Sequence, residues 1–341
     1  MKVRSRVWCG CFLSYVMVLG AAAQGYQVKK KIELGGDGGW DYLTVDNADR
    51  RLYIARATRV MVVDLDGGKL IGEIPEVTGA HGVAVVRDLG RGFATAGQTG
   101  DVVVFDTKDL KTLSRIKAGE SPDAILYDSF SKRLFVFNGR SKDATVIDAA
   151  SSTVAGTIPL GGKPEAGVSD GQGKVFVNIE DTAEIAELDA KEMKVLRRWK
   201  LGTCEDPTGL AFDAKNRILF SACGGNKQMA ISSADKGELV TTVEIGAGSD
   251  GAAFDPDSMN AFSTNGEGSI TVVHEDSPSK FTVSQTVTTQ RGARTVALDP
   301  KTHQVLTMTA QFGPAPAPTA EVPRPRPVAI PGTFAVLIVD K

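Results

Sequence analysis

The sequence of 341 residues is poor in aromatic residues, histidine and cysteine, and it has no excess of positive charge. Aromatic residues make up 6% of the chain, which has three histidines and four cysteines. The formal net charge is −2, so no overall positive field is available to attract nucleic acid or an anionic membrane. There is no C-x-x-C motif and no further cluster of soft ligands, which disfavours a redox or thiolate metal centre.

The residues that are abundant favour a β-rich protein. Apolar residues account for 42% of the chain and lean towards Val, Ile, Leu and Ala, while glycine is frequent, with 37 residues. This mixture is typical of many short strands separated by tight turns rather than of a helical bundle. The charged fraction of 23% indicates a globular chain with ample material for a core.

The first 23 residues have the features of a secretory leader. Three basic residues precede an uncharged stretch over 7–23, which ends in Ala-Ala-Ala. This pattern predicts a signal peptide over residues 1–23, cleaved near Ala23, and therefore a periplasmic or secreted protein with no membrane span after processing. A retained anchor is the alternative, although the apolar run is short for one. Processing leaves 36 basic and 41 acidic residues.

Two cysteines, Cys204 and Cys223, remain after the leader is removed. An even pair in an oxidising compartment predicts a disulfide. A pair of buried thiols and a metal or redox role are the alternatives.

A repeat of about 42 residues runs through the rest of the chain. An aromatic or leucine residue marks the same point of each unit at intervals of 40 to 44 residues, at Tyr53, Phe93, Phe135, Phe176, Phe220, Phe262 and Leu306. Units of this length with four short strands are typical of propeller blades. The sequence therefore predicts an all-β, seven-bladed β-propeller as a single domain over residues 24–341, and we expect a monomer.

The ends of the chain indicate how the ring closes. The last unit has only three strands after residue 294, and the segment 26–34 precedes the first unit without a partner. We expect this N-terminal strand to pair as the outer strand of the last blade, which would remove an exposed edge. A Pro-rich insert over 313–332 separates the second and third strands of that blade.

Several tetrapeptides resemble those of a known family. The second strands contain the tetrapeptides YIAR (53–56), FVFN (135–138) and FSTN (262–265). Two further motifs are SPDAI (121–125) and RGARTVALDP (291–300). These segments resemble the YVTN-repeat, or YncE-like, seven-bladed propellers. The resemblance covers the whole processed chain and is specific for the fold rather than for a function. The WD dipeptide repeat and the tryptophan docking motifs of quinoprotein propellers are not evident.

Propeller geometry brings one residue from each repeat to the mouth of the central channel, because the innermost strands all begin on the same face. The residues that open these strands are Asp41, His81, Asp123, Glu165, Asp206, Asp250 and Arg294. Five carboxylates around a narrow opening repel one another unless cations or water offset the charge. The sequence predicts a site for a polar ligand, a cation or a protein partner here; the alternative is that the carboxylates only cap backbone N–H groups.

An oxygen-rich ring of this kind favours a hard cation, so calcium is the expected ion if there is one. No catalytic residue is assigned, because His81 lacks an accompanying serine or cysteine nucleophile motif. A metal-dependent hydrolase or lactonase at the same site is the alternative function, and Asn138 and Asn265 support it as further polar groups on that face. Single-stranded DNA binding is a weaker alternative, which the negative charge and the few aromatic residues oppose.

Other acidic residues have a structural interpretation. Asp64, Asp106, Asp148 and Asp189 end third strands on the opposite face, where Asp side chains accept hydrogen bonds from turn N–H groups. The Pro-rich insert predicts an extended or mobile loop. The alternative hypothesis is that the insert is a lid or partner-docking arm, whose Arg324 and Arg326 contact the acidic ring.

Overall fold

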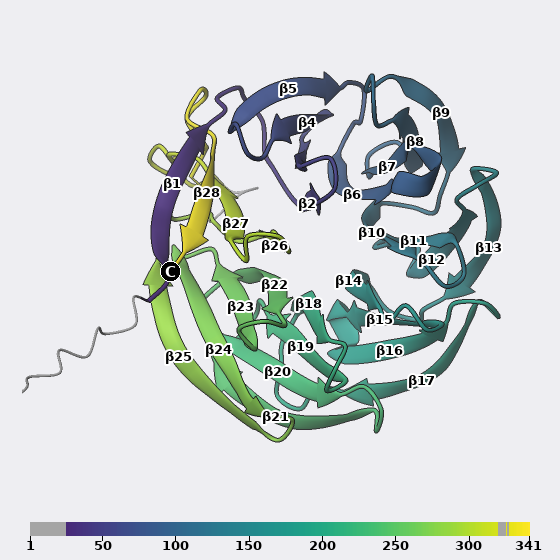
Figure 1. The fold of residues 1–341 in the computed structure, drawn as a ribbon, viewed down its shortest axis with the longest axis vertical. Coiled ribbons are helices and arrows are strands. Elements are labelled where there is room, and N and C mark those ends of the chain that lie inside the picture. Colours follow the sequence, from purple (N-terminus) through teal and green to yellow (C-terminus); the bar gives the residue numbers. More distant parts are fainter. Residues whose placement is uncertain (1–24, 320–324, 326) are drawn as a thin grey trace, which may run out of the picture.

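The computed structural model describes residues 25–319, 325 and 327–341, and the predicted leader over 1–23 lies outside them. In the described residues, 28 strands form seven separate four-stranded antiparallel sheets. The sheets are arranged as blades around a central axis (Figure 1). This confirms the prediction of an all-β, seven-bladed propeller.

The first four blades follow one another along the chain, each starting at the channel and ending at the rim. Blade 1 consists of β2 (Leu43–Asp46), β3 (Arg51–Arg56), β4 (Arg59–Asp64) and β5 (Lys69–Ile74). Blade 2 consists of β6 (Ala80–Val86), β7 (Arg91–Ala96), β8 (Asp101–Asp106) and β9 (Thr112–Lys117). Blade 3 consists of β10 (Pro122–Asp128), β11 (Arg133–Asn138), β12 (Asp143–Asp148) and β13 (Thr153–Pro159). Blade 4 consists of β14 (Pro164–Ser169), β15 (Lys174–Ile179), β16 (Glu184–Asp189) and β17 (Lys194–Lys200).

The remaining blades complete the ring. Blade 5 consists of β18 (Pro207–Asp213), β19 (Ile218–Cys223), β20 (Gln228–Ser233) and β21 (Glu238–Glu244). Blade 6 consists of β22 (Ser249–Asp255), β23 (Asn260–Asn265), β24 (Ser269–Ser277) and β25 (Lys280–Thr288). Blade 7 consists of β26 (Val296–Leu298), β27 (Val305–Thr309), β28 (Ala335–Asp340) and β1 (Gln27–Glu33).

Two short 3-10 helices, η1 (Arg87–Leu89) and η2 (Glu180–Thr182), interrupt this pattern. In the part of the chain that the structure describes, no helix has the length and apolarity needed to cross a membrane.

The core lies between neighbouring blades rather than in one central layer. Each of the seven apolar clusters draws its buried side chains from two adjacent blades. The repeated aromatic residues of the second strands are fully buried in these clusters. For example, the rings of Tyr53 in blade 1 and Phe105 in blade 2 lie 5.8 Å apart. The sequence repeat therefore arises because each blade has to fill the same gap against its neighbour.

The N-terminal strand closes the ring as predicted. β1 pairs with β28 in antiparallel register from Gln27–Asp340 to Glu33–Ala335, and Figure 1 shows these two strands side by side in blade 7. Ile32 is buried with side chains of blades 1 and 7. Tyr26 packs edge-on against Phe262 of blade 6 at 5.1 Å.

Aspartates in the tight turns accept hydrogen bonds from backbone N–H groups, as expected. Asp106 accepts from the Lys108 N–H at 2.7 Å, and Asp148 accepts from the Ser151 N–H at 2.8 Å. Some turn aspartates also join neighbouring blades. Both carboxylate oxygens of Asp299 in blade 7 accept hydrogen bonds from the Arg50 guanidinium of blade 1, at 2.8 and 2.6 Å.

Cys204 and Cys223 form the predicted disulfide, with their Cα atoms 5.5 Å apart. The bond links the loop before β18 to the end of β19, within blade 5. Both residues are buried.

We expect the Cys204→Ser/Cys223→Ser double variant to lose about 3 kcal/mol of unfolding free energy, the chain-entropy contribution of a loop of this length. Urea denaturation with and without reductant measures it. The wild type should lose a similar amount on reduction, whereas the double variant should not respond to reductant. Equal stability of the two proteins would contradict a stabilising role for this bond.

Candidate functional site

The residues that open the innermost strands are aimed by β-bulges. The register between first and second strands slips between Ala80 and Val83, between Pro122 and Ile125, and between Pro164 and Gly167. His81, Asp123 and Glu165 each lie inside one of these irregular steps. A bulge bends the strand and redirects its side chains, which turns these three ionisable groups towards the channel mouth.

Asp206 takes a different position from the other predicted residues. In blade 5 the register slips between Pro207 and Leu210, so Thr208 has the place that Asp123 and Glu165 have in their blades. Asp206 precedes the proline and is exposed. It does not line the cavity at the channel mouth, whereas Thr208 does.

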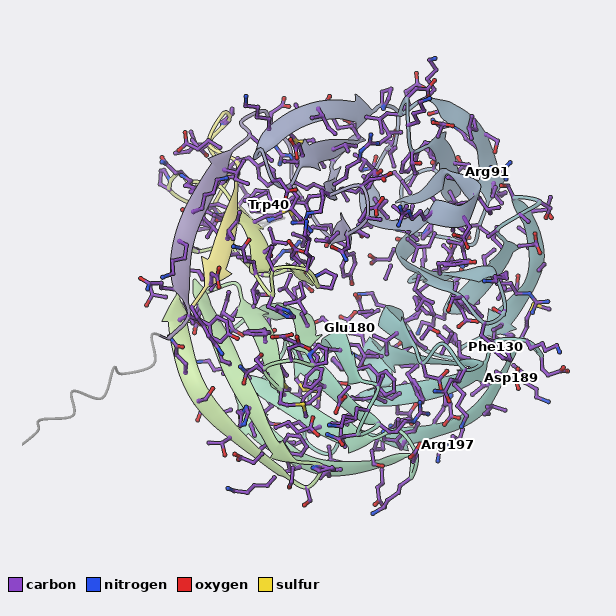
Figure 2. The ribbon with its side chains drawn as sticks, viewed as in Figure 1. Trp40, Arg91, Phe130, Glu180, Asp189 and Arg197 are labelled. Atoms are coloured by element: carbon purple, nitrogen blue, oxygen red, sulfur yellow. A yellow bond between two sulfur atoms is a disulfide. The ribbon has the colours of Figure 1, made fainter. Side chains whose placement is uncertain are left out.

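The other predicted residues meet at one cavity, which we call the carboxylate chamber. Its volume is about 330 Å³, and its lining consists of Asp41, Tyr42, Asp123, Lys163, Glu165, Glu180, Thr208, Asp250 and Arg294. His81 contacts two of these residues. Figure 2 shows Glu180 close to the centre of the ring. Among the described residues, five carboxyl groups therefore face three basic groups: His81 and Arg294, which the sequence predicted, and Lys163, which it did not.

One part of the chamber is a lysine between two glutamates. The Lys163 ammonium group lies 2.6 Å from Glu165 Oε1 and also contacts Glu180. Burial alone would lower the pKa of Lys163, but its hydrogen bonds to both carboxylates raise it above the ordinary value. Burial and the hydrogen bond with Glu180 raise the pKa of Glu165, while the pKa of Glu180 is lowered. Lys163 thus bridges the two carboxyl groups, and burial makes Glu165 the more basic of them.

A histidine between two aspartates forms the second part. His81 Nδ1 donates to Asp41 Oδ2 at 2.5 Å and lies 3.6 Å from Asp123 Oδ1. The hydrogen bond to Asp41 raises the pKa of His81, with a further contribution from Asp123. Burial and the charge of Asp41 raise the pKa of Asp123. Within the described residues, Asp123 Oδ1 is buried and accepts no hydrogen bond.

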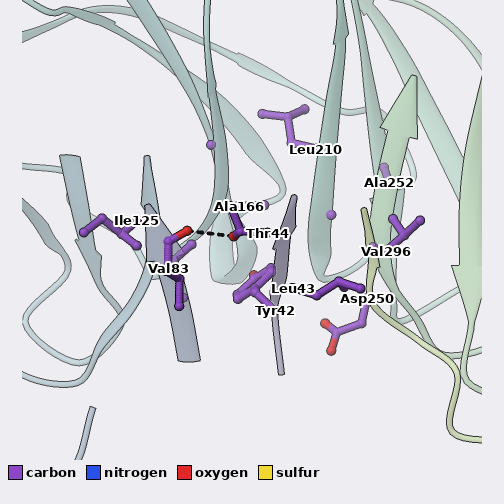
Figure 3. Close-up of a pocket in the computed structure, with 15 residues that line it drawn as sticks. Tyr42, Leu43, Thr44, Val83, Ile125, Ala166, Leu210, Asp250, Ala252 and Val296 are labelled. Carbon is purple, nitrogen blue, oxygen red and sulfur yellow. Dashed lines mark hydrogen bonds between the residues drawn. The ribbon is translucent and has the colours of Figure 1, made fainter. Parts of the chain in front are cut away.

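Asp250 and Arg294 form the third part, with Arg294 Nη1 3.0 Å from Asp250 Oδ2. Burial raises the pKa of Asp250 to about 6 against the opposing effect of Arg294. Asp250 and Tyr42 also line a narrower part of the channel below the chamber, of about 160 Å³ (Figure 3). Burial and the surrounding carboxylates raise the pKa of Tyr42, so its hydroxyl stays protonated and can donate a hydrogen bond.

The geometry of Asp41, His81 and Asp123 suits a metal ion. One ligand atom from each lies within 4.8 Å of the other two. The mixed nitrogen and oxygen set is compatible with a transition metal as well as with a hard cation. The remaining carboxylates of the chamber would add only oxygen ligands, which calcium prefers.

The two asparagines proposed as further site residues are used elsewhere. Asn138 Nδ2 donates to Asp143 and Thr145, and Asn265 Nδ2 donates to Ser269 and Thr271. Both residues are fully buried at the ends of β11 and β23. They hold the following loop to their own blade and do not line the chamber.

The base of the Pro-rich insert lies next to the channel mouth. Phe312 and Ala329 form a β-bridge, and the Gly313 N–H donates to the Val328 carbonyl at 3.0 Å. Arg324 and Arg326 lie outside the described residues, so the hypothesis that they reach the acidic ring stays a prediction. The chamber already has its own cations in Lys163 and Arg294.

Sequence reasoning missed Lys163, Glu180, Tyr42 and Thr208. Three of these lie within two residues of predicted site residues: Lys163 is two residues before Glu165, Tyr42 follows Asp41, and Thr208 is two residues after Asp206. Aligning the prolines that begin the first strands of blades 3, 4 and 5 would have identified Thr208, because it follows its proline as Asp123 and Glu165 follow theirs. Glu180 is the first residue of η2, directly after Ile179, which has the place in blade 4 that Asn138 has in blade 3. The sequence did not show that this short helix would turn the Glu180 side chain into the chamber.

The fold and the chamber define this protein as a seven-bladed, WD40-like β-propeller with a charged channel mouth. No family model matches the sequence, and no curated protein matches it. Similar solved structures include U3-55K, at 9% identity and a TM-score of 0.74, covering 93% of this chain and 99% of that one. A chain of the mitotic checkpoint complex matches at 16% identity and a TM-score of 0.71, covering 89% and 96%. At these identities the likeness concerns the fold alone.

Proposed function

We propose that this protein is a binding propeller that holds a cation, in the first place a divalent metal ion, in the carboxylate chamber. The observation that supports this most directly is the excess of acidic groups in one small cavity. Five carboxyl groups face Lys163, Arg294 and His81. Burying like charges raises their proton affinity, and a bound cation would take the place of the protons.

The unbonded oxygen of Asp123 adds to this argument. A buried carboxylate oxygen without a hydrogen bond is costly unless a ligand satisfies it. Asp123 Oδ1 is such an oxygen, and it belongs to the group of three residues with metal-ligand spacing. The same excess of carboxylates disfavours phosphate groups, and with them the single-stranded DNA alternative.

The location and family are part of the same proposal. The basic and then apolar start of the chain supports a periplasmic or secreted protein. The tetrapeptides YIAR, FVFN and FSTN lie in second strands β3, β11 and β23, which supports membership of the YVTN-repeat, or YncE-like, propellers. A protein partner or a neutral polar ligand at the channel-mouth face remains a separate candidate for the same surface.

Thermal unfolding with added ions tests the cation proposal. Millimolar CaCl₂, MgCl₂ or MnCl₂ is added to protein treated with a chelator and dialysed, and KCl of equal ionic strength is the reference. A ligand present at about 100 times its dissociation constant stabilises the folded state by about 2.7 kcal/mol, so we expect at least one ion to raise the melting temperature by roughly 5 °C. Native mass spectrometry should show one bound ion.

Two matched variants locate the effect. Asp123→Asn should abolish the shift, whereas Asp206→Asn removes the same charge from an exposed residue on the same face and should leave the shift unchanged. Equal shifts in both variants would place the ion elsewhere. No shift with any of the three ions, together with no bound metal, would overturn the proposal.

A metal-dependent hydrolase is a second candidate, favoured by the spacing of Asp41, His81 and Asp123. A bound divalent ion could activate a water molecule there. This candidate predicts hydrolysis of simple lactones or esters that is lost on chelation and in Asp123→Asn. Ion binding without any chelator-sensitive hydrolysis would leave binding as the function.

A further inference from the structure

A second cavity opens beside the carboxylate chamber and differs from it in chemistry. We call it the side pocket, and its volume is about 610 Å³. The side chains that decide its character are Trp40, Arg291, Arg294, Phe312, Val328 and Ala329. Arg294 lines both cavities, and Trp40 directly precedes Asp41 of the chamber. Figure 2 shows Trp40 over blade 7, next to β28.

The apolar wall of the side pocket consists of two aromatic rings held by ordered contacts. Trp40 and Phe312 have their ring centroids 6.1 Å apart, and Trp40 also packs against Phe334 at 5.3 Å. The insert fixes Phe312 through its bridge to Ala329. Gly292 has a φ of +86°, and a Cβ atom there would lie 2.7 Å from the Phe312 ring. A glycine at this position therefore keeps the ring and the pocket in place.

The charge of the side pocket is positive, in contrast to that of the chamber. Among the residues that the structure describes, its lining includes two guanidinium groups and no carboxylate. Arg294 is paired with Asp250. Arg291 is exposed and its guanidinium lies 6.0 Å from the Phe312 ring centroid, but no ion pair forms at Arg291 among the described residues. One guanidinium is thus available to a ligand at the edge of an aromatic surface.

We propose that the side pocket binds a small aromatic carboxylate. Its rings would lie against Trp40 and Phe312, where offset or edge-on aromatic contacts are favourable. Its carboxylate would pair with Arg291, since guanidinium–carboxylate hydrogen bonds are strong and often bidentate. The cavity has the size of sites for small organic ligands, which are mostly apolar with a few placed polar groups. The side pocket shares Arg294 with the carboxylate chamber, but the residues proposed to hold the ligand are Trp40, Phe312 and Arg291, so this inference does not rest on cation binding.

Isothermal titration calorimetry with 1-naphthoate tests the proposal on the full chain. We expect saturable binding with one site per chain. Arg291→Gln and Phe312→Ala should each weaken binding by about tenfold, because each removes one of the two interactions that define the site. Arg140→Gln is the matched control, since Arg140 is exposed and lies in the loop between β11 and β12 of blade 3. It should leave the affinity unchanged.

Two analogues distinguish the contribution of the ligand charge from that of the ring contacts. They also distinguish binding in the side pocket from binding in the acidic chamber. 1-Naphthalenemethanol lacks the charge, so it should bind the wild type more weakly than 1-naphthoate does. It should bind Arg291→Gln with the same affinity as it binds the wild type. 1-Naphthylmethylamine should not bind more tightly than the neutral analogue. Because Arg291 is exposed, its variant should melt at the wild-type temperature, so lost binding would not reflect unfolding. No naphthoate binding, or binding that is unchanged in both Arg291→Gln and Phe312→Ala, would overturn the proposal.

Discussion

Deleting residues 26–33 is expected to remove most of the stability of the propeller. The deletion takes away β1, so β28 loses six cross-strand residue pairs and becomes an exposed edge. It also removes the buried side chains of Ile32 and Tyr26, and burial of each contributes about 2–3 kcal/mol. With the lost ladder, the total is about 5–10 kcal/mol, comparable to the whole stability of a typical domain. Thermal and urea unfolding of the truncated and full chains measure it.

Point variants keep this prediction testable if the truncated chain does not fold. Ile32→Ala should lower the unfolding free energy by about 2–5 kcal/mol, as usual for a buried aliphatic side chain. Lys29→Ala, at an exposed position of the same strand, should change it by no more than about 0.5 kcal/mol. An unchanged melting temperature in both the truncated chain and Ile32→Ala would show that the ring does not depend on this closure.

The second large effect is a loss of stability as the pH rises from 4 to 8 in the absence of divalent ions. The chamber carboxyl groups Asp123, Glu165 and Asp250 have raised pKa values in the folded state. The folded protein therefore holds more protons than the unfolded chain, and its stability falls as these groups ionise. For Asp250, whose pKa is raised to about 6, the loss amounts to about 3 kcal/mol. The raised pKa of His81 acts in the same direction, because its charged form is the stabilised one.

Urea unfolding between pH 4 and pH 8, in the presence of a chelator, checks this effect. The Asp123→Asn/Glu165→Gln variant imitates the protonated chamber, so it should be more stable than the wild type at pH 8 and similar to it at pH 4. The Asp299 pKa, lowered to about 2 by Arg50 and neighbouring hydrogen bonds despite burial, contributes below this range and does not interfere. Asp206→Asn is the control. A wild-type stability that rises or stays level towards pH 8 would contradict the buried charge of the chamber.

The same groups link pH to the proposed cation. A bound ion would replace protons on Asp123 and Asp250, so we expect ion binding to be weaker at pH 5 than at pH 8. The ion should therefore stabilise the protein most near pH 8, where the ion-free protein is least stable. The pH titration and the ion titration thus test the chamber by independent measurements.

The repeat could be recognised in the sequence because every blade has the same packing requirement. Each second strand has to fill the gap against its neighbour, and Tyr53, Phe93 and Phe135 do so at the same point of the unit. The missing fourth strand of the last unit implied that residues 26–34 would close the ring. The turn aspartates followed from local hydrogen bonding, which depends only on neighbouring residues.

The sequence alone determined the seven blades and the closing strand, because both follow from the periodicity of the repeat, and it favoured the disulfide over two alternatives. It predicted ionisable groups at the channel mouth from all seven blades, which failed in blade 5. The tertiary structure decided which side chains share a cavity. Bulges at the start of the innermost strands direct Asp123 and Glu165 inwards, and they place Thr208 rather than Asp206 in the lining. Lys163 and Glu180 join them from a loop and from the short helix η2, and the base of the insert contributes Phe312, Val328 and Ala329 to the side pocket. These positions depend on contacts between residues that are distant in the sequence. A periodic pattern within one strand contains no information about such contacts.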